Sequence, residues 1–414
     1  MRGQASATRR WLSGHLESNV DSVAILPTHV CGMREGEAAV ANDRPLGVAI
    51  LGFGFIGKVH AYGHVNLPLF YDPPPVRTRL VGVATSSPAT ASKAQAALGF
   101  EMATTDQLAL IDRDDVDIVH ICTPNHLHRE AILRAMRANK HIYCDKPLTA
   151  TVAEADQIAS ALPDYKGTSQ MTLQCRFWPA VLRAKQLVEE GRLGAITHFR
   201  GAFLHAGNVD RSRPLNWKAD VQQGGGVLND LGSHIIDLLQ YLLGPLEPIH
   251  AIRRVWAKDR SDAKHPSCKI ADVAEDFVMV TMRTQEGAPG VVEASKIATG
   301  SEDEMRFEIH GERGALRFNQ MDPNWLDFCD LADRDVPLGG DRGWKRIAAV
   351  SRYEPPAGFP SPKASIGWMR CHMHCLYNFL DAVAKGQPGD PNLTVGIELQ
   401  RLLGRIKTLL VGVD

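Results

Sequence analysis

Short apolar strands alternate with helices through the first part of the chain, and this alternation constrains the fold more than any other feature. The hydrophobic pattern predicts strands at 47–54, 80–84, 116–122 and 140–144, and helices at 56–64, 89–98, 126–138 and 151–162. Such alternation is typical of a parallel sheet with helices on both faces. Residues 67–78 carry four prolines and are expected to form an inserted loop, because helices and central strands rarely accept proline.

The pattern changes after about residue 166. Strands are expected at 196–203, 275–283, 290–298, 305–310 and 315–318, and helices at 179–190, 229–243, 368–385 and 394–411. Strands that follow one another without a helix between them favour an antiparallel sheet. The sequence therefore predicts an α/β domain over 45–166 and an α+β domain over 167–414. The second domain is expected to have a large, mostly antiparallel sheet and a last helix that packs back on the first domain.

Charge and composition exclude several classes of protein. The formal net charge is −1, so we expect neither nucleic acid nor an anionic membrane surface as a partner. No apolar run approaches the roughly 18 residues of a membrane span. Eight cysteines in 414 residues are too few for a disulfide scaffold, which favours a reduced, cytoplasmic protein.

The first 44 residues have a different character. The segment Thr8-Arg9-Arg10-Trp11-Leu12 is faintly similar to a twin-arginine export signal, but Glu17 and Asp21 interrupt the apolar stretch that should follow. The favoured interpretation is a disordered extension over 1–44 that results from an upstream start codon, with Met33 as the alternative start. A targeting segment and a functional arm are the alternatives.

The segment Gly52-Phe53-Gly54-Phe55-Ile56-Gly57 follows the first predicted strand and opens a helix. In such a loop the first glycine permits a tight turn, the second lets the backbone approach a pyrophosphate, and the third lets the helix pack on the strand. Amides at the helix N-terminus then face the phosphates. The loop therefore predicts a dinucleotide-binding Rossmann domain over 45–166, with a purely structural turn as the alternative. The predicted cofactor contacts here are Gly52, Gly54, Phe55, Ile56 and Gly57.

The end of the second predicted strand bears on which dinucleotide is bound. An Asp or Glu there usually holds the ribose 2′-hydroxyl of NAD. Here Thr85-Ser86-Ser87-Pro88 offers no acid, and no arginine follows closely. Ser86 is the predicted contact, and both NAD and NADP stay open as the cofactor.

Three further motifs accompany the glycine loop. They are Ile121-Cys122-Thr123-Pro124-Asn125-His126-Leu127-His128, Cys144-Asp145-Lys146-Pro147-Leu148, and Gly224-Gly225-Gly226-Val227-Leu228-Asn229-Asp230-Leu231-Gly232-Ser233-His234. With these motifs the chain, from about Leu46 to Val411, resembles the glucose-fructose oxidoreductase / inositol dehydrogenase / rhizopine-catabolism (Gfo/Idh/MocA) family. The usual Glu-Lys-Pro of that family is Asp145-Lys146-Pro147 here, with a carboxylate one methylene shorter, so the position of the lysine can differ.

The resemblance implies a Rossmann domain followed by a domain for substrate binding and oligomerisation. It implies an NAD(P)-dependent oxidoreductase that interconverts a hydroxyl and a ketone on a sugar, sugar derivative or cyclitol. Relatives commonly form dimers or tetramers through the open face of the second sheet, so a homodimer or homotetramer with a small polyhydroxylated substrate is expected. The expected further cofactor contacts are Thr123, Pro124, Asn125, His128, Asp145 and Lys146, with a place on the helix surface as the alternative for His128.

Oxidation of an alcohol requires a base that takes the hydroxyl proton and benefits from a cation that stabilises the alkoxide. By resemblance, Lys146 is that cation. Asp230 and His234 are spaced i, i+4 and therefore share one face of a helix. We predict that His234 is the acid/base, since its unperturbed pKa lies near neutrality, and that Asp230 orients the substrate hydroxyl or the imidazole. The structural alternatives are a solvated lysine, an aspartate at a helix N-terminus and a core histidine.

Two other segments have a functional and a structural interpretation. Trp217-Lys218 precedes the triple glycine, in a region that approaches cofactor or substrate in the relatives; a surface loop is the alternative. Cys371-His372-Met373-His374-Cys375 has the residue types of a metal site, but a closed zinc site needs four suitably placed ligands. We therefore expect this segment to pack in the core, and no metal is predicted.

Two other functions stay open. One is an NAD-dependent glycosidase that works through transient oxidation and would use the same site. The other is a non-enzymatic, dinucleotide-binding regulator. A regulator need not keep Lys146, Asp230 and His234, so the presence of all three favours an enzyme.

Overall fold

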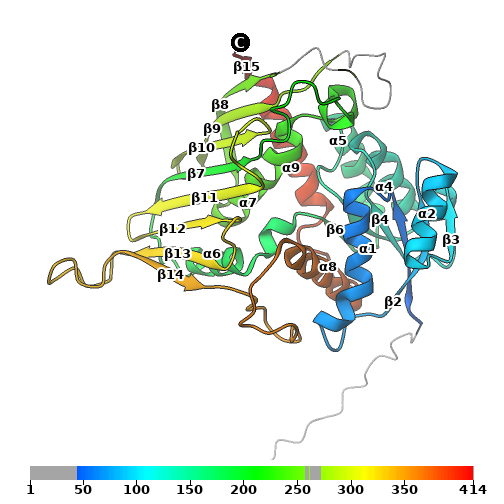
Figure 1. Cartoon of the computed structure of the whole chain (residues 1–414), viewed down its shortest axis with the longest axis horizontal. Helices are drawn as coiled ribbons and strands as arrows, with labels where there is room; N and C mark the ends of the chain where they lie inside the picture. Colours follow the sequence, from blue (N-terminus) through cyan, green and yellow to red (C-terminus); the bar gives the residue numbers. More distant parts are fainter. Residues whose placement is uncertain (1–43, 257–260, 262–271, 414) are drawn as a thin grey trace, which may run out of the picture. The chain divides into compact units, whose positions relative to one another are not determined.

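The computed structural model describes residues 44–256, 261 and 272–413. The predictions for 1–43, together with Cys31 and Cys268, lie outside the described residues. The described chain is built on two sheets, one within the first part of the sequence and one in the second (Figure 1).

The first sheet is parallel and has the strand order β3-β2-β1-β4-β5-β6. Its strands are β1 (Leu46–Leu51), β2 (Thr78–Ala84), β3 (Met102–Thr104), β4 (Ile118–Ile121), β5 (His141–Cys144) and β6 (Ser169–Met171). Every residue of β4 is buried, as expected for a strand that helices cover on both faces. The predicted parallel α/β arrangement is confirmed, whereas the three-residue strands β3 and β6 were not predicted.

Helices connect these strands: α1 (Phe55–Phe70), α2 (Pro88–Leu98), α3 (Gln107–Ile111), α4 (His128–Arg137) and α5 (Val152–Ala161). The predicted insert at 67–78 is wrong in its first part, because α1 continues through Pro68 to Phe70. Pro68 lies in the last turn of α1, where its missing N–H costs the helix a single hydrogen bond near the end. The Tyr71 amide still donates to the carbonyl of Leu67 and closes the helix.

The second sheet has nine strands in the order β14-β13-β12-β11-β7-β10-β9-β8-β15. Its bounds are β7 (Ile196–Leu204), β8 (Leu246–Arg254), β9 (Phe277–Thr284), β10 (Pro289–Ser295), β11 (Glu304–Gly311), β12 (Gly314–Asn319), β13 (Trp325–Asp330), β14 (Trp344–Ala348) and β15 (Leu410–Gly412). Neighbouring strands are antiparallel except for the parallel pairs β7–β10 and β8–β15. The prediction of a large, mostly antiparallel sheet is confirmed.

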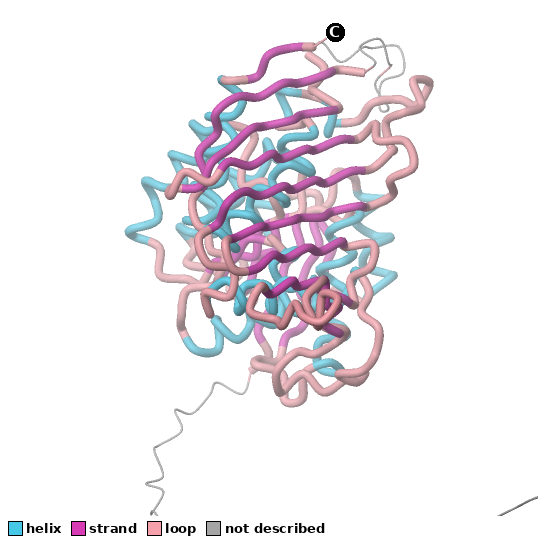
Figure 2. The backbone as a smooth tube through the Cα atoms, turned by 90° about the vertical axis from the view of Figure 1, so that its left-hand side faces the viewer, coloured by secondary structure: helices cyan, strands magenta, loops and turns pink. Residues whose placement is uncertain are grey.

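Helices cover one face of this sheet, and Figure 2 shows the strands of the other face in front, without helices over them. The helices of this part are α6 (Pro179–Glu189), α7 (Ser233–Leu243), α8 (Trp368–Lys385) and α9 (Leu393–Thr408). α8 packs against α1, and α9 packs against α5, so the end of the chain also contacts the helices of the first sheet. Within the described ranges no helix has the length and apolar character to cross a bilayer.

Candidate active site

The glycine loop leaves room for a dinucleotide. Gly52 has a φ of +87°, and a Cβ there would lie 2.6 Å from the carbonyl oxygen of Cys122. A Cβ at Gly57 would lie 2.1 Å from the Gly52 carbonyl oxygen, so only glycine lets α1 start this close to β1. Nothing lies within 4 Å of a Cβ built at Gly54, and the space beside this backbone is therefore free for a pyrophosphate.

The residues around the loop are polar or accessible. Phe55 is 74% exposed at the start of α1, and its ring packs at 5.5 Å from that of Trp368 on α8. Ser86 is exposed just past the end of β2. The neighbouring Ser87 caps α2 by accepting the amide of Thr90. The end of β2 thus presents hydroxyl groups in place of a carboxylate.

The loop after β4 connects the glycine loop to the second part of the chain. Buried Asn125 donates through Nδ2 to the carbonyl of Gly224 at 2.8 Å, and Asn229 donates to the same carbonyl at 2.9 Å. The Thr123 hydroxyl is buried and has no hydrogen-bond partner among the described residues. An unpartnered hydroxyl and an open glycine backbone at neighbouring strand ends fit a bound dinucleotide.

The alternative that His128 lies on the helix surface is wrong. His128 is fully buried at the start of α4. Its Nε2 lies 2.8 Å from the carbonyl oxygen of Thr123, and its Nδ1 lies 3.2 Å from the carbonyl oxygens of Pro147 and Leu148. The imidazole therefore braces the loops that follow β4 and β5 against each other.

Asp145 and Lys146 follow β5 directly. Lys146 reaches across to the second part of the chain, where its Nζ donates to the backbone carbonyl and, at 3.1 Å, to Oδ1 of Asp230. Burial raises the pKa of Asp145 to about 6, although the ammonium groups of Lys146 and Lys218 oppose this rise. The first sheet thus contributes one cation and one carboxyl of elevated pKa to the site.

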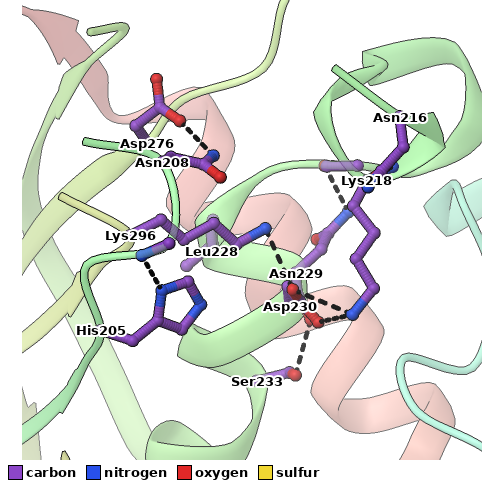
Figure 3. Close-up of polar contacts among 12 residues, drawn as sticks. His205, Asn208, Asn216, Lys218, Leu228, Asn229, Asp230, Ser233, Asp276 and Lys296 are labelled. Atoms are coloured by element: carbon purple, nitrogen blue, oxygen red, sulfur yellow. Dashed lines mark hydrogen bonds and ion pairs between the residues drawn. The ribbon is translucent and has the colours of Figure 1, made fainter. Parts of the chain in front are cut away.

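Asp230 lies in the π-helical turn η6 (Leu228–Gly232), which precedes α7. Three ammonium groups surround its carboxylate: Lys146 at 3.1 Å, Lys218 at 3.0 Å and Lys296 at 3.0 Å. Figure 3 shows the contacts of Lys218 and Lys296. Burial alone would raise the pKa of Asp230, but these three cations outweigh it and hold the pKa well below its usual range. Asp230 is therefore a permanent anion at neutral pH.

Lys218 and Lys296 join the site from different places. Lys218 lies in the short helix η4 (Trp217–Ala219) at the surface, where its side chain is 47% exposed, and its amine still reaches Asp230. Burial lowers the pKa of Lys218, but Asp230 outweighs that effect and the net shift is upward. Lys296 follows β10, and sequence reasoning missed it. The sequence held a clue to it. Alternate residues of a strand face the same side, so Lys296 is expected on the side of the buried Val292 and Ala294.

His234 lies one turn beyond Asp230, in the first turn of α7, and is 6% exposed. Its Nδ1 lies 3.7 Å from Sγ of Cys175. Burial, followed by the charge of Lys146, holds the pKa of His234 well below its usual value, although Asp230 opposes the shift. The imidazole is therefore neutral at physiological pH.

The cysteine- and histidine-containing segment at 371–375 forms part of α8. Cys371 and Cys375 are buried, and Cys375 Sγ accepts a hydrogen bond from Gln170. Across the described ranges, no group of three or more His, Cys, Asp or Glu side chains has the geometry to hold a metal ion.

Comparison with known proteins agrees with this geometry. A family described as "Oxidoreductase family, NAD-binding Rossmann fold" matches residues 46–172, and the "GFO/IDH/MocA C-terminal domain" matches residues 181–317. Levoglucosan dehydrogenase of Pseudarthrobacter phenanthrenivorans is 32% identical over 370 residues, which cover 86% of this chain and 93% of that protein. Inositol 2-dehydrogenase of Rhizobium meliloti is 29% identical over 286 residues, or 68% of this chain and 77% of that one.

A solved structure of levoglucosan dehydrogenase in complex with NADH and levoglucosan matches at a TM-score of 0.82 with 32% identity, covering 88% of this chain and 97% of that one. The predictions of an oxidoreductase, of an NAD-type dinucleotide site and of the two-part fold are confirmed. The resemblance noted in the sequence is confirmed as well: the chain belongs to the Gfo/Idh/MocA family of oxidoreductases.

Proposed function

We propose that this protein uses NAD or NADP to interconvert a hydroxyl and a ketone on a sugar, sugar derivative or cyclitol. The observation that carries the proposal is the ion pair between Lys146 and Asp230, which joins the end of β5 to η6. Relatives named levoglucosan dehydrogenase and inositol 2-dehydrogenase support a small polyhydroxylated substrate. The same cluster of charged side chains favours an enzyme over a non-enzymatic regulator.

The bound nicotinamide cofactor would supply the hydride acceptor. We assign Lys146 to the alkoxide that develops as the substrate hydroxyl loses its proton. His234 takes that proton, because its imidazole is neutral at working pH. Asp230 is already paired with three ammonium groups. Its assigned role is to hold the lysines in place.

The assigned cofactor contacts follow the carboxyl ends of β1, β2, β4 and β5, where ligands bind in open α/β sheets. They are Gly52, Gly54, Phe55, Ile56, Gly57, Ser86, Thr123, Pro124, Asn125, Asp145 and Lys146. His128 acts on the same site as a brace, since it contacts the carbonyl groups of both loops and is fully buried.

The test is a panel of sugars and cyclitols with NAD⁺ or NADP⁺, followed at the absorbance of the reduced nicotinamide. Net reduction of the cofactor identifies a dehydrogenase, release of an aglycone without net reduction identifies a glycosidase, and neither identifies a regulator. Lys146→Ala and His234→Ala are expected to lower kcat at least 10²-fold while NADH still binds. Lys385→Ala, at an exposed lysine of α8, is the matched control, and wild-type rates in both site variants would refute the assignment.

The proposal also covers the setting of the enzyme. The described cysteines form no disulfide, which supports a cytoplasmic protein. Exposed apolar residues on strands of the second sheet, among them Ile249, Val291 and Trp344, support a homodimer or homotetramer. Light scattering in solution tests the oligomer.

The division of the chain into two domains at about residue 166 stays a proposal. β6 follows that point in the sequence but pairs with β5 of the first sheet.

A further inference from the structure

The proposed site holds more positive charge than its contacts balance. Lys146, Lys218 and Lys296 all form their ion pairs, within the described part of the chain, with the single carboxylate of Asp230. The side chains of Lys146 and Lys296 are only 11% and 7% exposed. Water therefore solvates these two ammonium groups poorly, and charged groups in such surroundings are normally paired.

Asp145 and Asp303 are the neighbouring carboxyl groups that feel the charge of Lys146, and neither forms an ion pair with the three lysines among the described residues. Burial raises the pKa of Asp145 to about 6, and burial also raises the pKa of Asp303, which feels the charge of Lys146. Asp303 accepts a hydrogen bond from Gln320 at 2.8 Å. Asp276, beside the backbone of Lys296, accepts from Asn208 at 2.7 Å.

Unused hydrogen-bond donors accompany the surplus charge. An ammonium group has three N–H donors, and the ion pair of Lys296 with Asp230 engages one of them. In the parallel pairing of β7 with β10, Leu204 lies opposite Ser295, so that His205 and Lys296 come next to each other. Figure 3 shows this arrangement, with the Lys296 side chain extending from there to Asp230.

His205 adds a donor of defined direction. Its Nδ1 accepts the amide of Gly207 at 3.1 Å. Burial and the charge of Lys296 lower the pKa of His205 to about 4, so the ring is neutral at pH 7. A neutral imidazole that accepts at Nδ1 carries its proton on Nε2 and can donate only there. The ends of β7 and β10 therefore offer donors and positive charge.

We propose that the substrate is a polyol that carries an anionic group, a carboxylate or a phosphate, and that Lys296 and Lys218 bind this group with help from His205. Charge-assisted hydrogen bonds to an anion use the spare N–H donors and compensate the positive charge that Asp230 and Asp145 leave in the cluster. The inference rests on the proposed dehydrogenase function, since it names the substrate class of the same site.

The experiment compares D-glucose with D-gluconate, D-glucuronate and D-glucose 6-phosphate as substrates of the full-length enzyme with NAD⁺. We expect kcat/KM for at least one acidic compound to exceed that for D-glucose about ten- to hundred-fold, and to fall as ionic strength rises. The two sugar acids and the phosphate ester separate the two sources of negative charge.

Lys296→Met is expected to lower the ratio of acidic to neutral kcat/KM about ten- to hundred-fold, whereas Lys296→Arg keeps most of it. Lys385→Met, on an exposed lysine of α8, is the matched control for loss of one surface charge. Isothermal titration of the four compounds into the enzyme–NADH complex supplies a readout that does not depend on turnover, and it also shows whether Lys296→Met still binds NADH and is therefore folded.

The outcomes are distinguishable. Turnover of neutral and acidic compounds at equal efficiency, unchanged in Lys296→Met, overturns the inference and leaves the dehydrogenase proposal intact. Binding of an acidic compound that Lys296→Met abolishes supports the inference even if no compound is oxidised, and in that case the proposed function fails instead. Titration that shows no binding of any acidic compound overturns the inference as well.

Discussion

The ion pair between Arg176 and Asp237 is predicted to hold the helix of the acid/base in place. Arg176 lies in the short helix η3 (Gln174–Phe177), and Asp237 lies on α7, three residues after His234. The guanidinium donates through Nε to Oδ2 at 2.8 Å and through Nη2 to Oδ1 at 2.5 Å. The side chains are 9% and 2% exposed, so removal of Asp237 leaves the buried guanidinium with only the largely exposed Asp390, whose Oδ1 lies 3.5 Å from Nη1.

The size of the effect follows from this burial. Removal of one partner of a buried ion pair typically costs about 3–5 kcal/mol, whereas replacement of both by apolar side chains is often nearly neutral. Asp237→Leu alone is expected to lower the free energy of unfolding by about that amount. The double variant Arg176→Met, Asp237→Leu should recover most of the lost stability. The shift in Tm is the loss of free energy divided by the entropy of unfolding, which is roughly 0.8 kcal/mol per degree for a chain of this length. Tm should therefore fall by about 4–6 °C.

The assay is a double-mutant cycle by urea and thermal unfolding, with the exposed pair Arg401–Asp156 as a matched control, because surface pairs contribute about 0–1 kcal/mol. A loss below about 1 kcal/mol in Asp237→Leu, or a double variant no more stable than the single one, would refute the reasoning. In that case the position of α7 would depend on its apolar packing alone.

Three further predictions concern the site. Asp230→Asn leaves three ammonium groups without their carboxylate and should lower kcat/KM roughly 10²-fold or more; NADH formation measures this, and a wild-type rate contradicts the assigned role. Because the pKa of Asp145 is raised to about 6, its carboxyl is neutral below pH 6 and charged above it. We therefore expect kcat/KM for oxidation to rise with pH through about 6, as a second carboxylate joins Asp230 in compensating the ammonium groups. Asp145→Asn should remove that step, and an unchanged pH profile contradicts the prediction. Gly54→Ala should weaken NADH binding at unchanged Tm, whereas Gly57→Ala should lower both, since its Cβ would lie 2.1 Å from a backbone carbonyl; equal effects of the two substitutions on Tm would contradict this difference.

Much of the fold was predictable because its signals are local. Hydrophobic periodicity within a window of several residues identifies a helix or a strand. Such a period marks β1, α6 and β9 to β12. The three-residue strands β3 and β6 have no such period, and pairing with distant neighbours defines them. At Pro68 a local rule led to a wrong prediction, because packing of α1 against α8 outweighs one missing hydrogen bond in a last turn.

The burial of His128 is another feature that local sequence rules could not predict. Its position after a strand suggested either cofactor contact or the helix surface, and both are local interpretations. The structure places its imidazole between the carbonyl groups of Thr123 and Pro147, which belong to different strand ends. Only the pairing of β4 with β5 brings those two loops together.

The glycine loop and the parallel sheet could be predicted from the sequence, because both have local patterns. Asp230 and His234 became candidate catalytic residues through their spacing, and Lys146 became one through the family resemblance. That Lys218 and Lys296 share the carboxylate of Asp230 became visible in the folded chain alone. That arrangement depends on how β7 pairs with β10 and on where η6 meets the end of β5. Such contacts join residues far apart in the chain, and no local pattern encodes the distance between them.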